Sequence, residues 1–87
     1  MKTALIVFTS SVSGSRLKNL AQRAHIRDVR ITQTPSRIKS NGCSYSLRVF
    51  MSDLDRIINI ARHNNIHYSG VYKEEYDLNG HVMYTRI

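Results

Sequence analysis

The residue of this sequence with the greatest capacity for chemistry is its single cysteine, Cys43. Two cations, Arg37 and Lys39, lie within six residues of it, and the polar run Ser40-Asn41-Gly42 directly precedes it. The reactive form of cysteine is the thiolate, and nearby cations lower the pKa that governs its formation. The Asn-Gly turn could also aim backbone N–H groups at the sulfur. These residues therefore predict a thiolate held in an anion-stabilising loop.

The alternative is that Cys43 is packed in the protein core. Residues 43–51 alternate in polarity as in a half-buried strand, and Cys43 shares a face with Leu47 and Val49. Free cysteine is among the most buried residue types. Arg48 completes the set of anion-binding candidates, although its strand parity is opposite to that of Cys43. The sequence leaves both interpretations of the thiol open.

The charge of the chain is unevenly distributed. The formal net charge is +7 at pH 7, and residues 1–52 carry nine lysines and arginines against one acidic residue, Asp28. Such asymmetry points to an anionic partner, which could be a nucleic acid, a phosphate or an acidic protein, and a basic surface that is merely solvated is the equally open alternative. Arg30, Arg48 and Phe50 share the outward parity of the predicted strands. A sheet face of this kind could bind RNA, but the aromatic motif of RNA-recognition sheets is absent.

Periodicity predicts the elements that must position these residues. Apolar or alternating runs predict five strands, at residues 3–9, 28–33, 43–51, 67–76 and 81–86. Apolar residues at helical spacing predict two helices, with the stripes Leu17, Leu20, Ala21, Ala24 and Leu54, Ile57, Ile58, Ala61. We expect Ser13 or Ser15 to cap the first helix. The pattern Ser52-Asp53-Leu54-Asp55 predicts a capping box at the start of the second.

The resulting order β-α-β-β-α-β-β predicts one α+β domain spanning residues 1–87. We expect a ferredoxin-like sandwich with an added C-terminal strand, in which both helices cover one face of a mainly antiparallel sheet. A chain of 87 residues has room for one such core. In this arrangement the serine-rich turn at residues 10–15 and Cys43 need not lie at the same end of the sheet.

The segments that surround Cys43 resemble those of the selenium/sulfur (Se/S) carrier-like family of small proteins. The likeness covers most of residues 3–72. It is carried by the segments Phe8-Thr9-Ser10, Thr34-Pro35-Ser36-Arg37-Ile38, Gly42-Cys43, Leu47-Arg48-Val49 and Ile66 to Tyr72. The sequence differs from the family in having Ser36 between proline and arginine and Ser44 after the cysteine. The resemblance implies a carrier in which Cys43 holds sulfur or selenium between a donor and an acceptor protein.

The remaining features narrow the function. A lone cysteine argues against a dithiol oxidoreductase and fits a reducing compartment, so we expect a cytoplasmic protein. We find no acid–base pair or cofactor motif, and the four-residue spacing of His63 and His67 gives little support for a metal site because Asn64-Asn65 should end the helix between them. We therefore expect no stand-alone enzyme, no cofactor and no metal. No segment approaches the roughly 20 apolar residues of a membrane span, so we expect no membrane partner.

The sequence therefore predicts a cysteine-based sulfur or selenium carrier, with a persulfide or selenosulfide on Cys43. The alternative is a small basic module that binds nucleic acid or an acidic protein, with Cys43 in a structural role. Either function is compatible with a homodimer formed through the open sheet face or the last edge strand.

Overall fold

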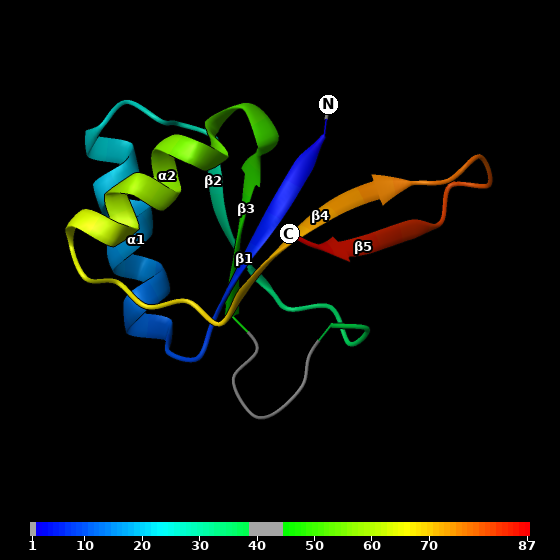
Figure 1. Cartoon of the computed structure of the whole chain (residues 1–87), viewed down its shortest axis with the longest axis horizontal. Helices are drawn as coiled ribbons and strands as arrows, with labels where there is room; N and C mark the ends of the chain where they lie inside the picture. Colours follow the sequence, from blue (N-terminus) through cyan, green and yellow to red (C-terminus); the bar gives the residue numbers. More distant parts are fainter. Residues whose placement is uncertain (1, 39–44) are drawn as a thin grey trace.

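The elements follow the order that the periodicity predicts. The computed structural model describes residues 2–38 and 45–87 (Figure 1). Its elements are β1 (Thr3–Phe8), α1 (Ser11–Arg23), β2 (Val29–Gln33), β3 (Tyr45–Phe50), α2 (Met51–His63), β4 (Gly70–Tyr76) and β5 (Val82–Arg86). Two helices and a five-stranded antiparallel sheet confirm the predicted α+β class.

The strands lie in the order β2-β3-β1-β4-β5, and every neighbouring pair is antiparallel. Strand β1 is central, with β3 on one side and β4 on the other. Both helices lie on one side of this sheet (Figure 1). The C-terminal strand β5 is added at one edge beside β4, as expected. The more specific expectation, that the fold is ferredoxin-like, stays a prediction.

The apolar core fills the space between the helices and the sheet. Alternate residues of β1 point into it, and Ala4, Ile6 and Phe8 are fully buried. The helices contribute the stripes that helical spacing predicts, with Leu17, Ala21, Leu54, Ile57 and Ala61 buried. Within the described residues, neither helix combines the length and the apolar character needed to cross a membrane.

The opposite side of the sheet, which no helix covers in Figure 1, is called the helix-free face below. It consists of the residues of β1 that alternate with the core residues, together with the residues opposite them on β3 and β4. Pairs directly opposite each other in an antiparallel sheet share a face. The face therefore includes Thr3 with Phe50 and Glu74, Leu5 with Arg48 and Tyr72, and Val7 with Ser46 and Gly70.

The two helices end in the same way, forty residues apart. His25 and Asn65 both take a left-handed backbone, with φ of 65° and 53°. The next amides, of Ile26 and Ile66, then donate to the carbonyl five residues earlier at 3.0 and 2.9 Å. These bonds satisfy carbonyls that a helix end would otherwise leave unpaired. The two helices thus end with the same backbone conformation and the same hydrogen bond.

The start of α1 differs from the prediction. The helix begins at Ser11, and the N-cap is Ser10, whose hydroxyl accepts a hydrogen bond from the Val12 amide at 3.2 Å. The predicted caps, Ser13 and Ser15, lie inside the helix. Ser10 follows closely on the end of β1 at Phe8, and its backbone is extended, as that of an N-cap residue normally is.

The start of α2 also differs from the prediction. The helix begins at Met51 immediately after β3, and its N-cap, Phe50, makes no side-chain capping bond. The predicted capping box at Ser52 is therefore wrong. The Met51 amide instead donates to the backbone carbonyl of Lys2 at 3.0 Å, so a neighbouring chain segment satisfies the first free amide of the helix.

Candidate functional site

The connection between β2 and β3 carries most of the predicted site. The pairing of these strands ends at Gln33 and Tyr45, so residues 34–44 join two adjacent strands. Hairpin loops are usually about 2–5 residues long, and longer ones commonly carry function. Five predicted site residues lie outside the described part of the chain: Lys39, Ser40, Asn41, Gly42 and Cys43. Their roles stay predictions.

The described beginning of this connection is held against the helix-free face. The hydroxyls of Thr34 and Ser46 share a buried hydrogen bond of 2.6 Å, which ties the segment to β3. Arg37 then donates from Nη1 to the backbone carbonyl of Val82 on β5 at 2.8 Å. Residues 34–38 therefore reach from β3 toward the far edge of the sheet, on the side away from the helices (Figure 1).

Burial on the helix-free face fits this arrangement. Leu5 is 0% and Val7 8% exposed, although no helix lies over them. Ser46, which points to the same face, is 1% exposed and has Thr34 as its partner. The face near the start of β3 is therefore sealed from water, and a polar group there must be hydrogen-bonded, as these two hydroxyls are.

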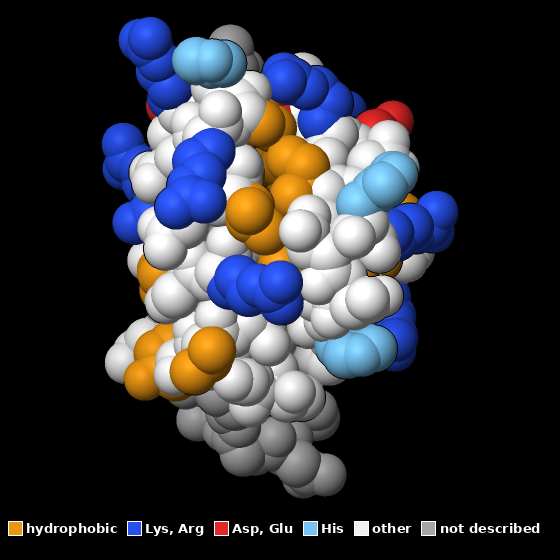
Figure 2. Space-filling model, turned by 90° about the vertical axis from the view of Figure 1, so that its left-hand side faces the viewer, with side chains coloured by type: hydrophobic (Ala, Val, Ile, Leu, Met, Phe, Trp, Pro, Cys, Tyr) orange, Lys and Arg blue, Asp and Glu red, His pale blue; other side chains and the backbone are white. Residues whose placement is uncertain are grey.

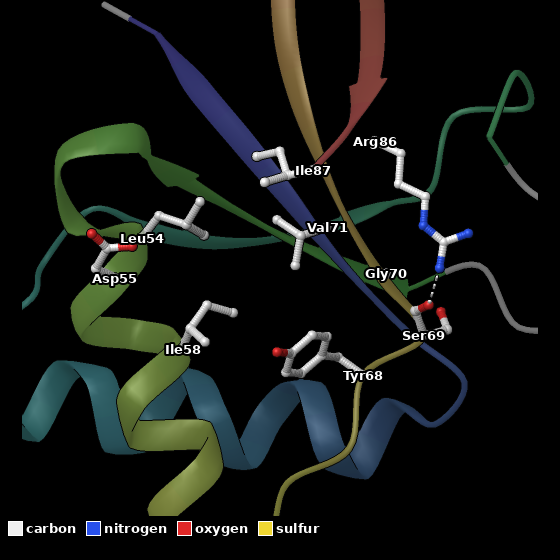
Figure 3. A pocket seen from close by; sticks show the side chains of 9 residues that line it. All are labelled: Leu54, Asp55, Ile58, Tyr68, Ser69, Gly70, Val71, Arg86 and Ile87. Atoms are coloured by element: carbon white, nitrogen blue, oxygen red, sulfur yellow. Dashed lines mark hydrogen bonds between the residues drawn. The ribbon is translucent and has the colours of Figure 1, made fainter.

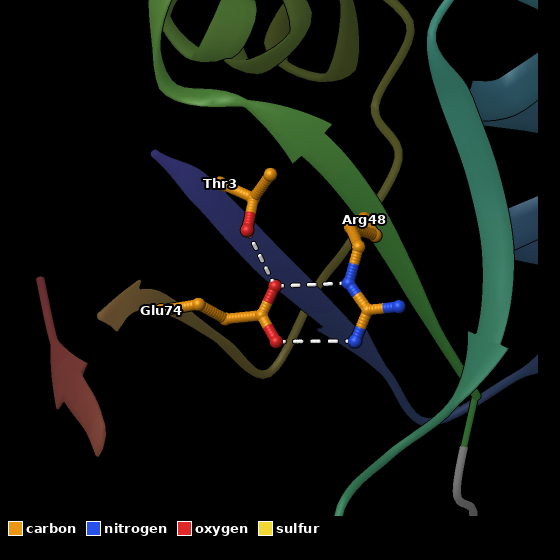
Figure 4. A network of polar contacts seen from close by, with 3 residues as sticks. All are labelled: Thr3, Arg48 and Glu74. Carbon is orange, nitrogen blue, oxygen red and sulfur yellow. Dashed lines mark hydrogen bonds and ion pairs between the residues drawn. The ribbon is translucent and has the colours of Figure 1, made fainter. Parts of the chain in front are cut away.

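Arg48, the other described cation of the predicted site, binds a carboxylate of its own chain. Its Nε and Nη2 donate to the two oxygens of Glu74 at 2.9 and 3.1 Å (Figure 4). Thr3 donates from its hydroxyl to the same carboxylate at 2.6 Å. The two-point geometry is the strong form of an arginine–carboxylate pair. The structure thus brings Arg48 together with Glu74, from the two strands that flank β1.

The electrostatics of this pair follow from its partial burial. The Glu74 side chain is 2% exposed, and burial alone would raise the pKa of its carboxyl. Hydrogen bonds from Arg48 and Thr3 lower that pKa by more, so the net pKa lies below its ordinary value. The hydrogen bond to Glu74 raises the pKa of Arg48. Burial, followed by the charge of Glu74, raises the pKa of Tyr84 on β5.

The serine-rich turn and the start of β3 lie at the same end of the sheet. Phe8, the last residue of β1, pairs with Tyr45, the first residue of β3. Cys43 lies outside the described residues, so the expectation that it need not share an end of the sheet with this turn stays a prediction. Helix α1 begins here, and its first turn holds no acidic residue. The free amides of a helix start favour anions at such a position.

Sequence reasoning missed the partners of both described cations. Glu74 and Val82 lie 26 and 45 residues from the arginines that they bind. One signal for Glu74 existed in the sequence, because an acidic residue in the middle of a predicted strand must either face water or find a cation. No sequence signal points to Val82, because Arg37 uses the backbone carbonyl there.

One described pocket lies apart from the predicted site residues, on the helix-covered side of the sheet. It measures about 340 Å³ and lies between α2 and β4 (Figure 3). Its walls are mostly apolar and include Leu54, Ile58 and Val71. Residues 34–38 do not line it. Within residues 2–38 and 45–87, no three histidine, cysteine, aspartate or glutamate side chains gather as metal ligands.

Comparison with known proteins assigns the chain to a family. The family described as "Putative Se/S carrier protein-like" matches residues 3–73. The chain belongs to this family. The match includes the whole connection between β2 and β3 and ends within β4, before Glu74 and β5. No curated protein and no solved structure matches the chain.

Proposed function

We propose that this chain is a cysteine-based carrier that holds sulfur or selenium on Cys43. The observation that carries the proposal is the family match over residues 3–73, within which the chain has its single thiol. Donor and acceptor proteins of sulfur or selenium metabolism would be its partners. A reducing compartment such as the cytoplasm would keep the thiol free.

The transfer step is a thiol exchange. The Cys43 thiolate attacks the outer atom of a donor persulfide, R–S–SH, or of its selenium counterpart, R–S–SeH. The bond between the two donor atoms breaks, the outer atom becomes bonded to the Cys43 sulfur, and the donor leaves as R–S⁻. No net oxidation or reduction occurs, so the step needs no further reactant. An acceptor thiolate removes the cargo by the same exchange.

The absence of a second thiol supports this chemistry. A resolving cysteine would attack the loaded sulfur, form a disulfide and expel the cargo. The sequence has one cysteine, so no such reaction can occur within one chain.

The frame around the cysteine segment supplies positive charge. Arg37 is fixed by its bond to the Val82 carbonyl, and the start of α1 lies at the same end of the sheet as the start of β3. Both features would favour a thiolate on the intervening segment. Lys39 would add to this effect, and Ser40, Asn41 and Gly42 would shape the loop. Arg48 would stabilise the thiolate less, because Glu74 neutralises its charge.

A mass measurement tests the carrier chemistry. The reduced protein is incubated with a low-molecular-weight persulfide, and intact mass spectrometry is expected to show one added sulfur atom that excess thiol removes. The variant Cys43→Ser should gain nothing. If the native protein gains no sulfur while its thiol reacts fully in denaturant, then Cys43 is a packed structural residue and the proposal fails.

The proposed role of Arg37 has its own test. The rate of Cys43 alkylation is measured against pH for the wild-type protein, for Arg37→Gln, and for Arg30→Gln as a control with the same change of charge. We expect Arg37→Gln to move the profile to higher pH by more than the control does, because a fixed cation nearby favours the thiolate. Equal shifts in the two variants would show a general effect of net charge only.

A further inference from the structure

A strip of half-buried apolar side chains lies between α1 and α2 on the outer side of the helix layer. It consists of Leu20 and Ala24 from the end of α1 and Ile60 from α2, and is called the interhelical strip below. Arg56 donates from Nη2 to the Ala24 carbonyl at 3.1 Å, which places these flanks of the two helices side by side. Figure 2 shows this side of the molecule, with apolar side chains in a strip among basic ones.

Arginines border the interhelical strip. Arg16 and Arg23 lie four residues before and three residues after Leu20, so all three share one flank of α1. Arg56 lies four residues before Ile60 on the facing flank of α2. Helix α1 carries no acidic residue. Within the described part of the chain, none of these three arginines takes part in an ion pair.

We propose that the interhelical strip and its arginines bind an acidic amphipathic helix of a partner protein. A helix that recognises an apolar surface presents apolar residues at positions i, i+3 or i+4, and i+7. Such a row matches the strip of Leu20, Ala24 and Ile60, and carboxylates on either side of the row would reach Arg16, Arg23 and Arg56. The surface therefore offers both the apolar contact and the complementary charge. The inference does not depend on thiol chemistry.

Two other occupants fit the surface less well. Nucleic acid would use the arginines through its phosphates, but the apolar strip would gain nothing from a phosphate backbone. A second copy of the chain would bring another net charge of +7 against this surface. Helix α2 contains Asp53 and Asp55, whereas α1 contains no acidic residue, so the positive charge is strongest along α1.

A peptide titration tests the proposal. The probe is a synthetic helical peptide with leucines at i, i+4 and i+7 and glutamates on both flanks, and binding to the full chain is followed by fluorescence anisotropy. Arg16→Glu combined with Arg23→Glu should weaken binding by about tenfold or more. The matched control combines Arg30→Glu with Arg86→Glu, which makes the same change of charge on exposed residues of β2 and β5. We expect the control to change affinity by no more than about twofold.

Two further measurements decide between the occupants. Ile60→Ser should weaken peptide binding without changing net charge, and an oligo-uridine RNA should bind more weakly than the peptide. Circular dichroism confirms that each variant is folded. The proposal is overturned if the peptide does not bind, if both double variants lose affinity equally, if Ile60→Ser has no effect, or if the RNA binds more tightly than the peptide.

Discussion

The two helices end alike, but the strands that follow them have different surroundings. β2 lies at an edge of the sheet with β3 as its one neighbour, whereas β4 lies between β1 and β5. Ile31 on β2 and Val71 on β4 both face the helix layer, forty residues apart. Ile31 is 43% exposed and Val71 is 9% exposed. The local sequence sets the helix and its end, while the number of neighbouring elements decides how far a strand is buried.

The largest change in the free energy of unfolding is expected from truncating a core residue of either helix, and it tests whether the two helices contribute equally to the core. Leu17 and Ile57 occupy equivalent positions and are both fully buried. Truncating either to alanine should lower the free energy of unfolding by about 2–5 kcal/mol, measured by urea denaturation. The exposed pair Asn19→Ala and Asn59→Ala provides the matched control. A large cost at one helix and a small cost at the other would contradict the equivalence.

A smaller effect is expected from the ion pair between Arg48 on β3 and Glu74 on β4. Glu74→Gln keeps the shape of the side chain but leaves Arg48 without its counter-charge. Because Arg48 is 41% exposed, water would compensate in part, and we expect a loss of about 1–3 kcal/mol in the free energy of unfolding. The control Glu75→Gln removes a neighbouring carboxylate with long surface contacts of 3.6 and 4.0 Å. It should cost less than about 0.5 kcal/mol.

The same pair predicts a pH dependence. The pKa of Glu74 is lowered in the folded protein, so its contribution to stability is present above the ordinary glutamate pKa. That contribution is lost as the pH falls through the lower, folded-state pKa. The stability difference between wild type and Glu74→Gln should therefore be constant near neutral pH and shrink in acid. A difference that stays constant to the lowest accessible pH would contradict the assigned pairing.

The smallest expected effect concerns the shared helix ends. A left-handed backbone costs most residues about 1–2 kcal/mol, whereas glycine adopts it freely and asparagine tolerates it. After the entropy cost of glycine, His25→Gly should raise the free energy of unfolding by about 0.5 kcal/mol. Asn65→Gly should change it less. A larger gain at Asn65, measured by urea denaturation, would show that the two ends are not equivalent.

The order of helices and strands was predictable because it depends on local periodicity. The apolar stripes of both helices and the alternation of the strands appear in the sequence and are confirmed in the core. The helix starts were predicted less well. Where a helix begins depends on where the preceding strand ends, as at Ser10 and Phe50, and strand ends depend on pairing partners.

The candidate site was predictable only in part. The family match covers the segment around Cys43, and the role of this segment stays a prediction. The partners of Arg37 and Arg48 could not be found, because they lie far away in the sequence and one is a backbone carbonyl. The arginines on α1 were visible as a charge asymmetry, but only the fold shows that they border an apolar strip.

The bond between Arg37 and Val82 has a consequence for biosynthesis. A ribosome delivers Arg37 long before Val82, which belongs to the last strand of the sheet. The thiol-bearing connection therefore emerges from the exit tunnel without its anchor on β5. Its final attachment must wait until β5 has been made and has joined β4.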